Sequence, residues 1–267
     1  MKKKILTAAL LTFAALTLVV VTVFVTVAYL TASSAVSNVF TVGDVSITMF
    51  ETKVNADGEA VDPYQEVDTN SYHLVPKKTY KKDPTIRVTA KLKEDEMYLF
   101  VKSSNQIRKI EAGNQENAPA GTPLTMRAQM EANGWVEYVR SGDGIEIVWV
   151  YGKRDVTTGE ITPTPVNPET KQKKKDGTDG PKKAGDFVLC ENFTIAANAD
   201  VSLYAAAKVN FTAFAIQTTG IDGVYSAWEA IKETFPYEGG IVSPVNPYDP
   251  LEDPYEPIPG EEPTPVS

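Results

Sequence analysis

The sequence contains a single histidine, His73, and this scarcity excludes most histidine-dependent chemistry. A catalytic zinc site usually takes two or three histidines, or a motif such as H-E-x-x-H, and neither occurs. A Ser-His-Asp triad would have to use His73, and the chain lacks a G-x-S-x-G turn. It also lacks a P-loop and a G-x-G-x-x-G motif. The sequence therefore predicts no catalytic, cofactor-binding or metal-binding residues, and a protein that is not an enzyme.

Cysteine is equally scarce, because Cys190 is the only one in the chain. A single cysteine excludes an intramolecular disulfide. The apolar residues 187–189 directly precede it. This setting predicts a buried, structural thiol rather than a reactive or intermolecular one.

The chain also lacks a well-formed calcium loop. Residues 55–59, Asn-Ala-Asp-Gly-Glu, superficially resemble one. With Gly58 at the sixth position of an EF-hand loop, however, Lys53 falls on the first ligand position and Tyr64 on the twelfth. We interpret this segment as a hairpin turn, and Asp143 with Glu146 as a weak signal for another oxygen-ligand ion site.

Positive charge is in deficit, since 26 Lys and Arg face 35 Asp and Glu for a formal net charge of −9 at pH 7. Nucleic-acid binding requires clustered cations against phosphate. An acidic balance favours solubility instead. We therefore expect no nucleic-acid partner.

Charge is absent altogether from residues 5–30, which follow the positive start Met-Lys-Lys-Lys. This is the layout of a secretory signal. A small-x-small pattern ending at Ala28 predicts cleavage there, with a mature N-terminus at Tyr29, and residues 33–35 offer a second cut. The alternative is an uncleaved membrane anchor, because the run is long enough to span a bilayer. Either way we expect an extracellular or cell-surface protein that meets the membrane only through this segment.

What the remaining chain does contain is strand-like alternation. Residues 85–92 place Ile86 and Val88 on one face and Arg87 and Thr89 on the other. Similar patterns, separated by Gly, Asn and Asp turn signals, predict strands within residues 45–49, 97–101, 145–151 and 201–216. The pattern indicates an all-β fold, a sandwich or barrel.

One segment has helical spacing instead, with apolar residues at Val224, Trp228, Ile231 and Phe235. Asp222 and Gly223 favour its start, and Pro236 its end. It predicts a short amphipathic helix near the C-terminal end, anchored in the core by Trp228.

Two hydrophilic segments break the strand pattern. Residues 152–185 are rich in Pro, Gly, Thr and Lys and predict a mobile, unpacked basic insertion, whose functional alternative is a contact with acidic polymers or anionic lipid. Residues 237–267 hold eight prolines and seven acids with no Lys or Arg, and predict a disordered acidic tail. The expected organisation is a signal peptide at 1–28, a β-domain at 29–236 and this tail.

Several phrases carry a family resemblance. The apolar run is followed by Asn38, Val39, Phe40, Thr41, Val42, Gly43, Asp44 and Val45. This phrase resembles exported Gram-positive proteins with a SipW-type signal peptide, the TasA/camelysin group. Supporting phrases are Leu74-Val75-Pro76, Lys82-Asp83-Pro84-Thr85-Ile86, Ala215-Ile216-Gln217 and Ala227-Trp228-Glu229-Ala230-Ile231. The chain departs from the family at Lys77, where relatives often have Gly, and at the 152–185 insertion and the tail.

The resemblance implies a jelly-roll-like β-sandwich with small helices, secretion and a structural role in biofilm matrix fibres. Camelysin-like members have also been described as metalloproteases, but the near-absence of histidine argues against that activity here. We expect a secreted or cell-surface subunit that self-associates or binds matrix components. The alternative is a monomeric surface binding module for carbohydrate or a host protein.

In TasA-like fibres an N-terminal segment can complete the sheet of the next subunit. The matching segment here is residues 29–41, with Val36, Val39, Phe40 and Val42 as the apolar positions of the possible assembly strand. The alternative is that this segment pairs within its own subunit as an ordinary first strand.

Overall fold

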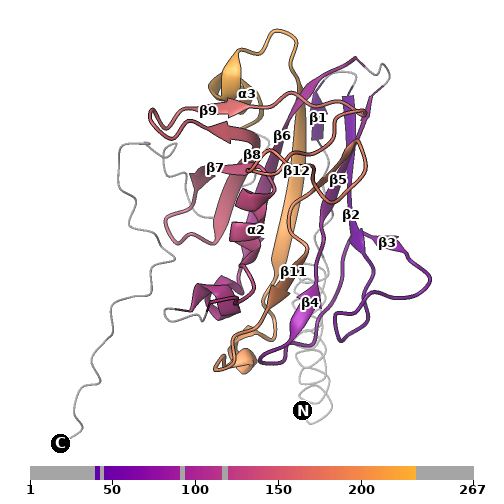
Figure 1. Ribbon diagram of the computed structural model, residues 1–267, viewed down its shortest axis with the longest axis vertical. Helices are drawn as coiled ribbons and strands as arrows, with labels where there is room; N and C mark the ends of the chain where they lie inside the picture. The colour runs from indigo at the N-terminus through magenta and orange to yellow at the C-terminus, as the bar shows by residue number, and fades with distance from the viewer. Residues whose placement is uncertain (1–39, 43–44, 91–93, 116–119, 233–267) are drawn as a thin grey trace, which may run out of the picture. The chain divides into compact units, whose positions relative to one another are not determined.

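The computed structural model describes residues 40–42, 45–90, 94–115 and 120–232 (Figure 1). All of them belong to one compact unit of the chain, which begins at residue 37. The described strands are β1 (Phe40–Val42), β2 (Val45–Thr52), β3 (Glu66–Val67), β4 (Thr79–Lys81), β5 (Thr85–Ala90), β6 (Met97–Asn105), β7 (Trp135–Arg140), β8 (Glu146–Arg154), β9 (Ile161–Pro163), β10 (Asp186–Val188), β11 (Asn192–Thr194) and β12 (Val209–Gln217). The described helices are α2 (Met126–Ala132), α3 (Gly223–Ile231) and the 3-10 turns η1 (Arg108–Ile110), η2 (Ala112–Asn114) and η3 (Val201–Tyr204).

Most of the strands belong to two sheets. One has the order β1-β12-β6-β8-β7, with β9 also paired to β8, and the other has the order β10-β5-β2-β3. A small pair, β11-β4, lies beside them. The pairings among these strands are antiparallel except for β1 with β12, which is parallel. With two α-helices among the described residues, the protein is all-β, as the sequence predicts.

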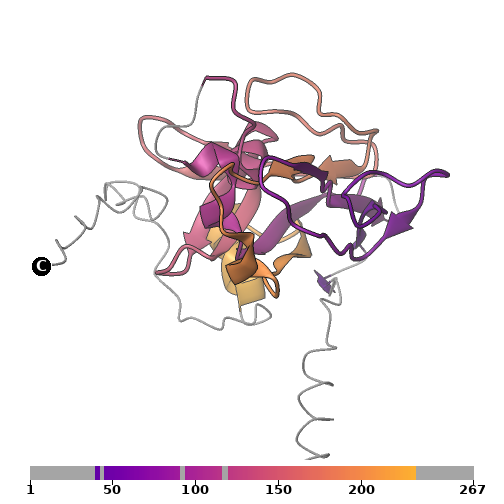
Figure 2. The same cartoon turned by 90° about the horizontal axis from the view of Figure 1, so that it is seen from below.

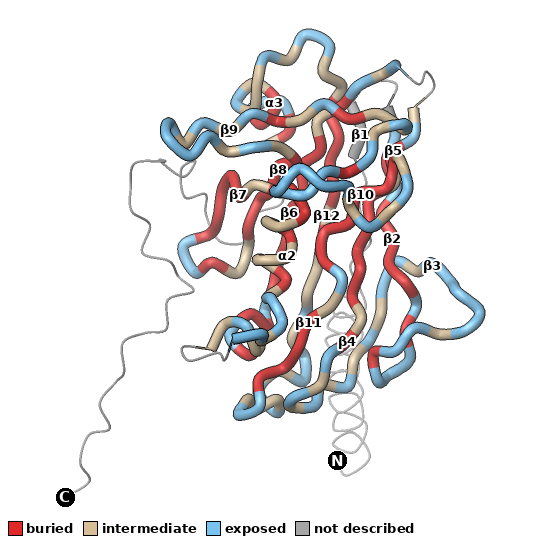
Figure 3. The backbone as a smooth tube through the Cα atoms, in the orientation of Figure 1, coloured by how far each residue is buried: buried red, intermediate tan, exposed pale blue. Residues whose placement is uncertain are grey.

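The main core takes its residues from both sheets. Ile47 and Ile86 come from the four-stranded sheet, and Leu99 and Trp149 from the larger one. The predicted alternation in β5 is confirmed over the described residues, because Ile86 and Val88 are buried whereas Thr89 is exposed. The central strands are mostly buried, and exposed residues gather in the connecting loops (Figure 3).

The second face of the larger sheet carries a separate apolar cluster. In β6, Leu99 belongs to the main core and Phe100 to this second cluster, as the two-residue period of a strand requires. Helix α2 contributes Met130 to the main core, whereas α3 contributes Trp228 to the second cluster. The two helices therefore lie on opposite faces of the sheet, as Figure 2 shows.

Helix α3 is where the helical spacing predicts it, although residues 233–235 lie outside the described part. The Trp228 side chain is 4% exposed. Its ring centroid lies 6.4 Å from that of Phe100 and 5.7 Å from that of Tyr138. Within the described residues no helix combines the length and apolarity needed to span a bilayer.

The prediction of one long strand over residues 201–216 is wrong in its first half. Residues Val201–Tyr204 form η3, and β12 begins only at Val209. The Asp200 carboxylate accepts hydrogen bonds from the Ser202 N–H at 3.1 Å and the Ser202 hydroxyl at 2.6 Å. This local side-chain cap offers the backbone an alternative to the sheet ladder.

The prediction that residues 152–185 are an unpacked insertion is also wrong. Strand β9 pairs with β8. Val166 is fully buried and forms a bridge with Met97, and Gln172 is 1% exposed. The segment is therefore anchored to both sheets through a few buried side chains, while its turns remain on the surface.

Candidate functional site

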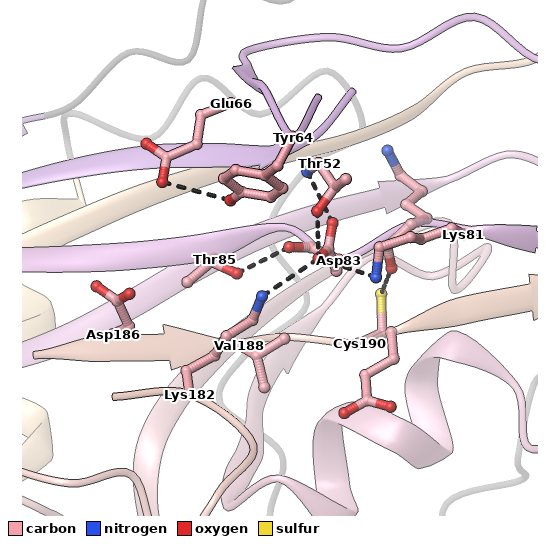
Figure 4. Close-up of polar contacts among 12 residues, drawn as sticks. Thr52, Tyr64, Glu66, Lys81, Asp83, Thr85, Lys182, Asp186, Val188 and Cys190 are labelled. Atoms are coloured by element: carbon pink, nitrogen blue, oxygen red, sulfur yellow. Dashed lines mark hydrogen bonds and ion pairs between the residues drawn. The ribbon is translucent and has the colours of Figure 1, made fainter. Parts of the chain in front are cut away.

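The most connected polar site surrounds Asp83, between β4 and β5 (Figure 4). Its carboxylate accepts hydrogen bonds from the Thr52 N–H and the Thr52 hydroxyl, both at 2.8 Å. The ammonium groups of Lys81 and Lys182 lie 3.2 and 3.3 Å away. The Asp83 side chain is only 3% exposed. It thus ties strand β2 to the β4–β5 connection and to the 152–185 segment.

Burial would raise the pKa of Asp83, but its partners outweigh that effect. The hydrogen bonds from Thr52 and the positive charges of Lys81 and Lys182 together hold this pKa below its ordinary value. The carboxylate is therefore ionised at neutral pH and fully engaged. Such an arrangement cross-links the fold and leaves no free acid or base for catalysis at this position.

Beside this site, Arg87 organises the outer face of the four-stranded sheet. Its guanidinium donates to Asp186 at 2.9 Å and to Glu66 at 3.0 Å, and lies 4.2 Å from the Phe50 ring centroid. The hydrogen bonds to Asp186 and then to Glu66 raise the pKa of Arg87. The neighbouring Tyr64 is 58% exposed and donates its hydroxyl to Glu66 at 3.4 Å (Figure 4). The Tyr64 ring thus presents an apolar face to solvent, with its polar hydroxyl held at one edge.

On the inner side, the residue next to Asp83 enters the core. The Lys82 ammonium lies 3.0 Å from the Glu51 carboxylate. The Cys190 thiol donates to the Lys82 carbonyl at 3.5 Å and is fully buried. Burial raises the pKa of Cys190, so the protonated thiol is unreactive, and the prediction of a buried cysteine is confirmed.

A second buried carboxylate, Glu111, was not found by sequence reasoning. It accepts hydrogen bonds from the Asn105 amide and from the backbone N–H of Met126, both at 2.7 Å. Desolvation raises the pKa of Glu111 to about 7, against the two hydrogen bonds that favour its charged form. Glu111 therefore joins β6 to the start of α2 and titrates near neutrality.

The possible assembly strand is described only in part. Ala28, Tyr29, Val36 and Val39 lie outside the described residues. Phe40 and Val42 belong to β1, which pairs in parallel with β12 so that Phe40 is opposite Phe214 and Val42 opposite Ile216. This pairing within the chain is the alternative that the sequence left open.

The residues that the sequence offers as weaker candidates for a catalytic or ion-binding site do not come together in one place. His73 is exposed and its backbone is paired, with its N–H to Ala56 at 3.1 Å and its carbonyl to the Tyr80 hydroxyl at 2.7 Å. Asp143 accepts from Ser141 and Ile145, whereas Glu146 pairs with Lys102 at 2.8 Å. The described residues contain no group of three or more His, Cys, Asp or Glu placed to hold a metal ion.

Residues 55–59 form the turn that the sequence predicts. The Asn55 N–H donates to the Glu59 carbonyl and the Gly58 N–H to the Asn55 carbonyl, both at 2.9 Å. Gly58 has φ of 75°, and a Cβ there would lie 2.4 Å from the Tyr80 ring. Glycine is therefore required by the turn and its packing rather than by an ion.

Comparison with protein-family models, curated proteins and solved structures found no match to this chain.

Proposed function

We propose that the protein is an exported structural subunit of the TasA/camelysin-like kind, with a jelly-roll-like β-sandwich, that self-assembles at the cell surface or in an extracellular matrix. The observation that carries this proposal is the pairing of β1 with β12. Strand β1 covers three residues of the edge of a nine-residue strand. The preceding sequence is the predicted export signal and cleavage site.

The register explains how such an edge supports assembly. Continuing the β1 pairing toward the N-terminus would place positions 35–39 opposite residues 209–213 of β12. Among the described strands, those β12 residues pair only with β6. A strand edge offers a row of backbone N–H and C=O groups to an added strand. The same edge can accept this segment from its own chain or from a second copy, and exchange between copies would build a fibre.

Removal of residues 29–37 from the mature protein tests this proposal. We expect electron microscopy to show fibres of the mature protein and none of the shortened one, while circular dichroism still reports a folded monomer. The matched control removes the nine residues 259–267 instead and should leave assembly intact. Fibres that persist without residues 29–37 would exclude the segment as the exchanged strand, and an unfolded product would favour pairing within one chain.

Export makes a separate prediction. Cleavage after Ala28 frees the segment that is to be exchanged, so N-terminal sequencing of protein from the envelope and the culture supernatant should begin at Tyr29. If envelope protein still begins at Met1, the N-terminal segment is an uncleaved membrane anchor. The segment proposed for exchange would then have no free N-terminus.

Tyr64 favours a second candidate, a monomeric module that binds surface carbohydrate. The exposed ring lies beside Glu66, next to the Arg87 and Asp186 ion pair. In that case the mature protein should stay monomeric and bind isolated envelope polysaccharide, and Tyr64→Ala should abolish the binding. Assembly that is unaffected by Tyr64→Ala would support the first candidate.

A further inference from the structure

Positive charge is concentrated on one hairpin of this acidic protein. Residues 171–183, here called the lysine hairpin, contain six lysines and two aspartates, although the chain as a whole has a net charge of −9. Lys173 pairs with Asp179 across the hairpin, and Lys182 pairs with Asp83. Lys174, Lys175 and Lys183 are exposed and form no ion pair with another described residue. The Lys174 charge acts on the Asp176 carboxylate, but six lysines against two aspartates leave the hairpin with a net positive charge.

A buried glutamine holds the base of the lysine hairpin in place. The Gln172 amide donates to the carbonyls of Asn133 at 2.9 Å and Val188 at 2.8 Å, and accepts from the Val188 N–H at 2.9 Å. The hairpin closes through Gly180 N–H to the Gln172 carbonyl at 2.7 Å and Lys174 N–H to the Thr178 carbonyl at 2.8 Å. A backbone that is fixed before binding loses less conformational entropy when a partner arrives.

The chain itself contains a segment of the opposite charge. Residues 237–267, here called the acidic tail, hold seven acids and no lysine or arginine. Eight prolines remove many of its N–H groups, so this segment is a poor strand for a sheet edge and its charges are its main means of contact. The acidic tail lies outside the described residues and follows the last of them, Lys232, by a few positions.

Tethering makes this contact favourable. Covalent geometry limits the reach of any segment of about 30 residues to at most on the order of 100 Å, at about 3.3–3.6 Å per residue. A domain of this size is roughly 40 Å across. Because the acidic tail is covalently attached, its contact with the hairpin is an intramolecular event, and weaker charge contacts suffice than between separate molecules.

We propose that the acidic tail of each chain docks on the lysine hairpin of the same chain. The contact is electrostatic, with carboxylates of the tail against Lys174, Lys175 and Lys183. It depends on salt because the groups are at the surface, where ions screen charges beyond about 10 Å at 0.1 M.

Paramagnetic relaxation on the full mature chain tests the docking. A nitroxide is attached at Tyr255→Cys, between Asp253 and Glu256, in a Cys190→Ala background. At 20 mM NaCl we expect the amide signals of residues 174–178 to broaden at least twofold relative to the reduced label. At 500 mM NaCl the broadening should disappear. Signals that stay sharp at 20 mM NaCl would overturn the proposal.

Charge reversal supplies the matched variants. Lys174→Glu with Lys175→Glu and Lys183→Glu should abolish the broadening, and so should Glu252→Lys with Asp253→Lys and Glu256→Lys. Combining the two sets should restore it. The control reverses the charges of Lys53, Lys109 and Lys208, which are also exposed but lie outside the hairpin, and should keep the broadening. Broadening that survives reversal of the hairpin lysines would contradict the assigned contact.

A mixed sample shows whether the docked tail belongs to the same chain or to a second copy. Isotope-labelled protein without nitroxide is combined with unlabelled protein that carries it. Sharp signals for residues 174–178 are expected in the mixture, because the docked tail belongs to the same chain. Broadening in the mixture would assign the contact to a second copy and overturn the proposal as stated.

Discussion

The Lys82 ammonium lies 3.0 Å from the Glu51 carboxylate, and both side chains are less than a tenth exposed. The rings of Tyr72 and Phe211 lie 5.7 and 5.8 Å from the same ammonium group. The pair therefore connects β2 to the β4–β5 link in a largely apolar setting. Both charged side chains are thus largely shielded from bulk water.

Removal of one of these two charges should lower the stability of the fold far more than removal of both. We expect Lys82→Met or Glu51→Leu alone to lower the free energy of unfolding by about 3–5 kcal/mol, because each leaves an uncompensated buried charge. The combined variant should recover most of that loss. Urea denaturation of the four proteins measures the coupling, and strictly additive losses would show that the two charges do not stabilise each other.

Glu111 should make stability depend on pH in an unusual direction. Its pKa in the folded protein is raised to about 7, above the ordinary value of 4.5 that applies to the unfolded chain. The neutral form is therefore favoured by folding, and this contribution is complete below about pH 4.5 and lost as pH rises through about 7. The total is about 3 kcal/mol.

The comparison with Glu111→Gln isolates this group from other titrating residues. Between pH 5 and 8 the parent should lose stability relative to the variant, as measured by denaturation midpoints at constant ionic strength. If the difference in stability between the two proteins stays constant from pH 5 to 8, Glu111 does not titrate as assigned.

Lys77 occupies a backbone conformation that suits glycine. Its φ of 68° is the only positive value of a non-glycine residue in the described part of the chain. The Lys78 N–H donates to the Val75 carbonyl at 3.2 Å, so Pro76 and Lys77 are the central residues of a turn that needs positive φ at its second central position. We expect Lys77→Gly to stabilise the protein by about 1 kcal/mol. Lys77→Ala keeps the Cβ and removes the charge, and an equal gain from it would show that strain is not the cause.

Trp228 and Tyr225 lie on the same helix and form a matched pair. Trp228 is 4% exposed, whereas Tyr225 is 62% exposed. Trp228→Ala should cost about 3–5 kcal/mol because it empties the space between α3 and the sheet. Tyr225→Ala should stay within roughly 0.5 kcal/mol. Thermal unfolding of both variants distinguishes them, and similar small losses would place the Trp228 face outside the core.

Local periodicity in the sequence predicted the elements that bury one regular face and expose the other. Strand β5 alternates in sequence because one face is buried, and α3 has helical spacing because one stripe covers the sheet. Strand β7 was missed, since a bulge between Glu137 and Val139 breaks its alternation. Helix α2 was missed because it is short, although its cap was detectable from Thr125, whose hydroxyl accepts from the Ala128 N–H at 3.1 Å.

The polar sites could not be predicted because their partners are distant in sequence. Asp83 meets Thr52 across 31 positions and Lys182 across 99. Burial of the 152–185 segment likewise rests on scattered residues, such as Val166 and Gln172, that stand alone in a hydrophilic sequence. No periodic signal marks such residues, because their burial is set by the two sheets against which they pack.

Exchange of β1 between copies would bring positions 41 and 215 of different chains together, so a disulfide between two differently substituted proteins would reveal it. Thr41 and Ala215 are partners in the β1–β12 register. Neighbouring strands lie about 4.7–4.9 Å apart, a separation that a disulfide can span. Thr41→Cys and Ala215→Cys are made in separate chains, both in a Cys190→Ala background, then mixed, assembled and oxidised. If β1 is exchanged, a non-reducing gel should show a disulfide-linked dimer of one chain of each kind. Absence of that dimer, together with a disulfide formed efficiently when both cysteines are in one chain, would contradict strand exchange.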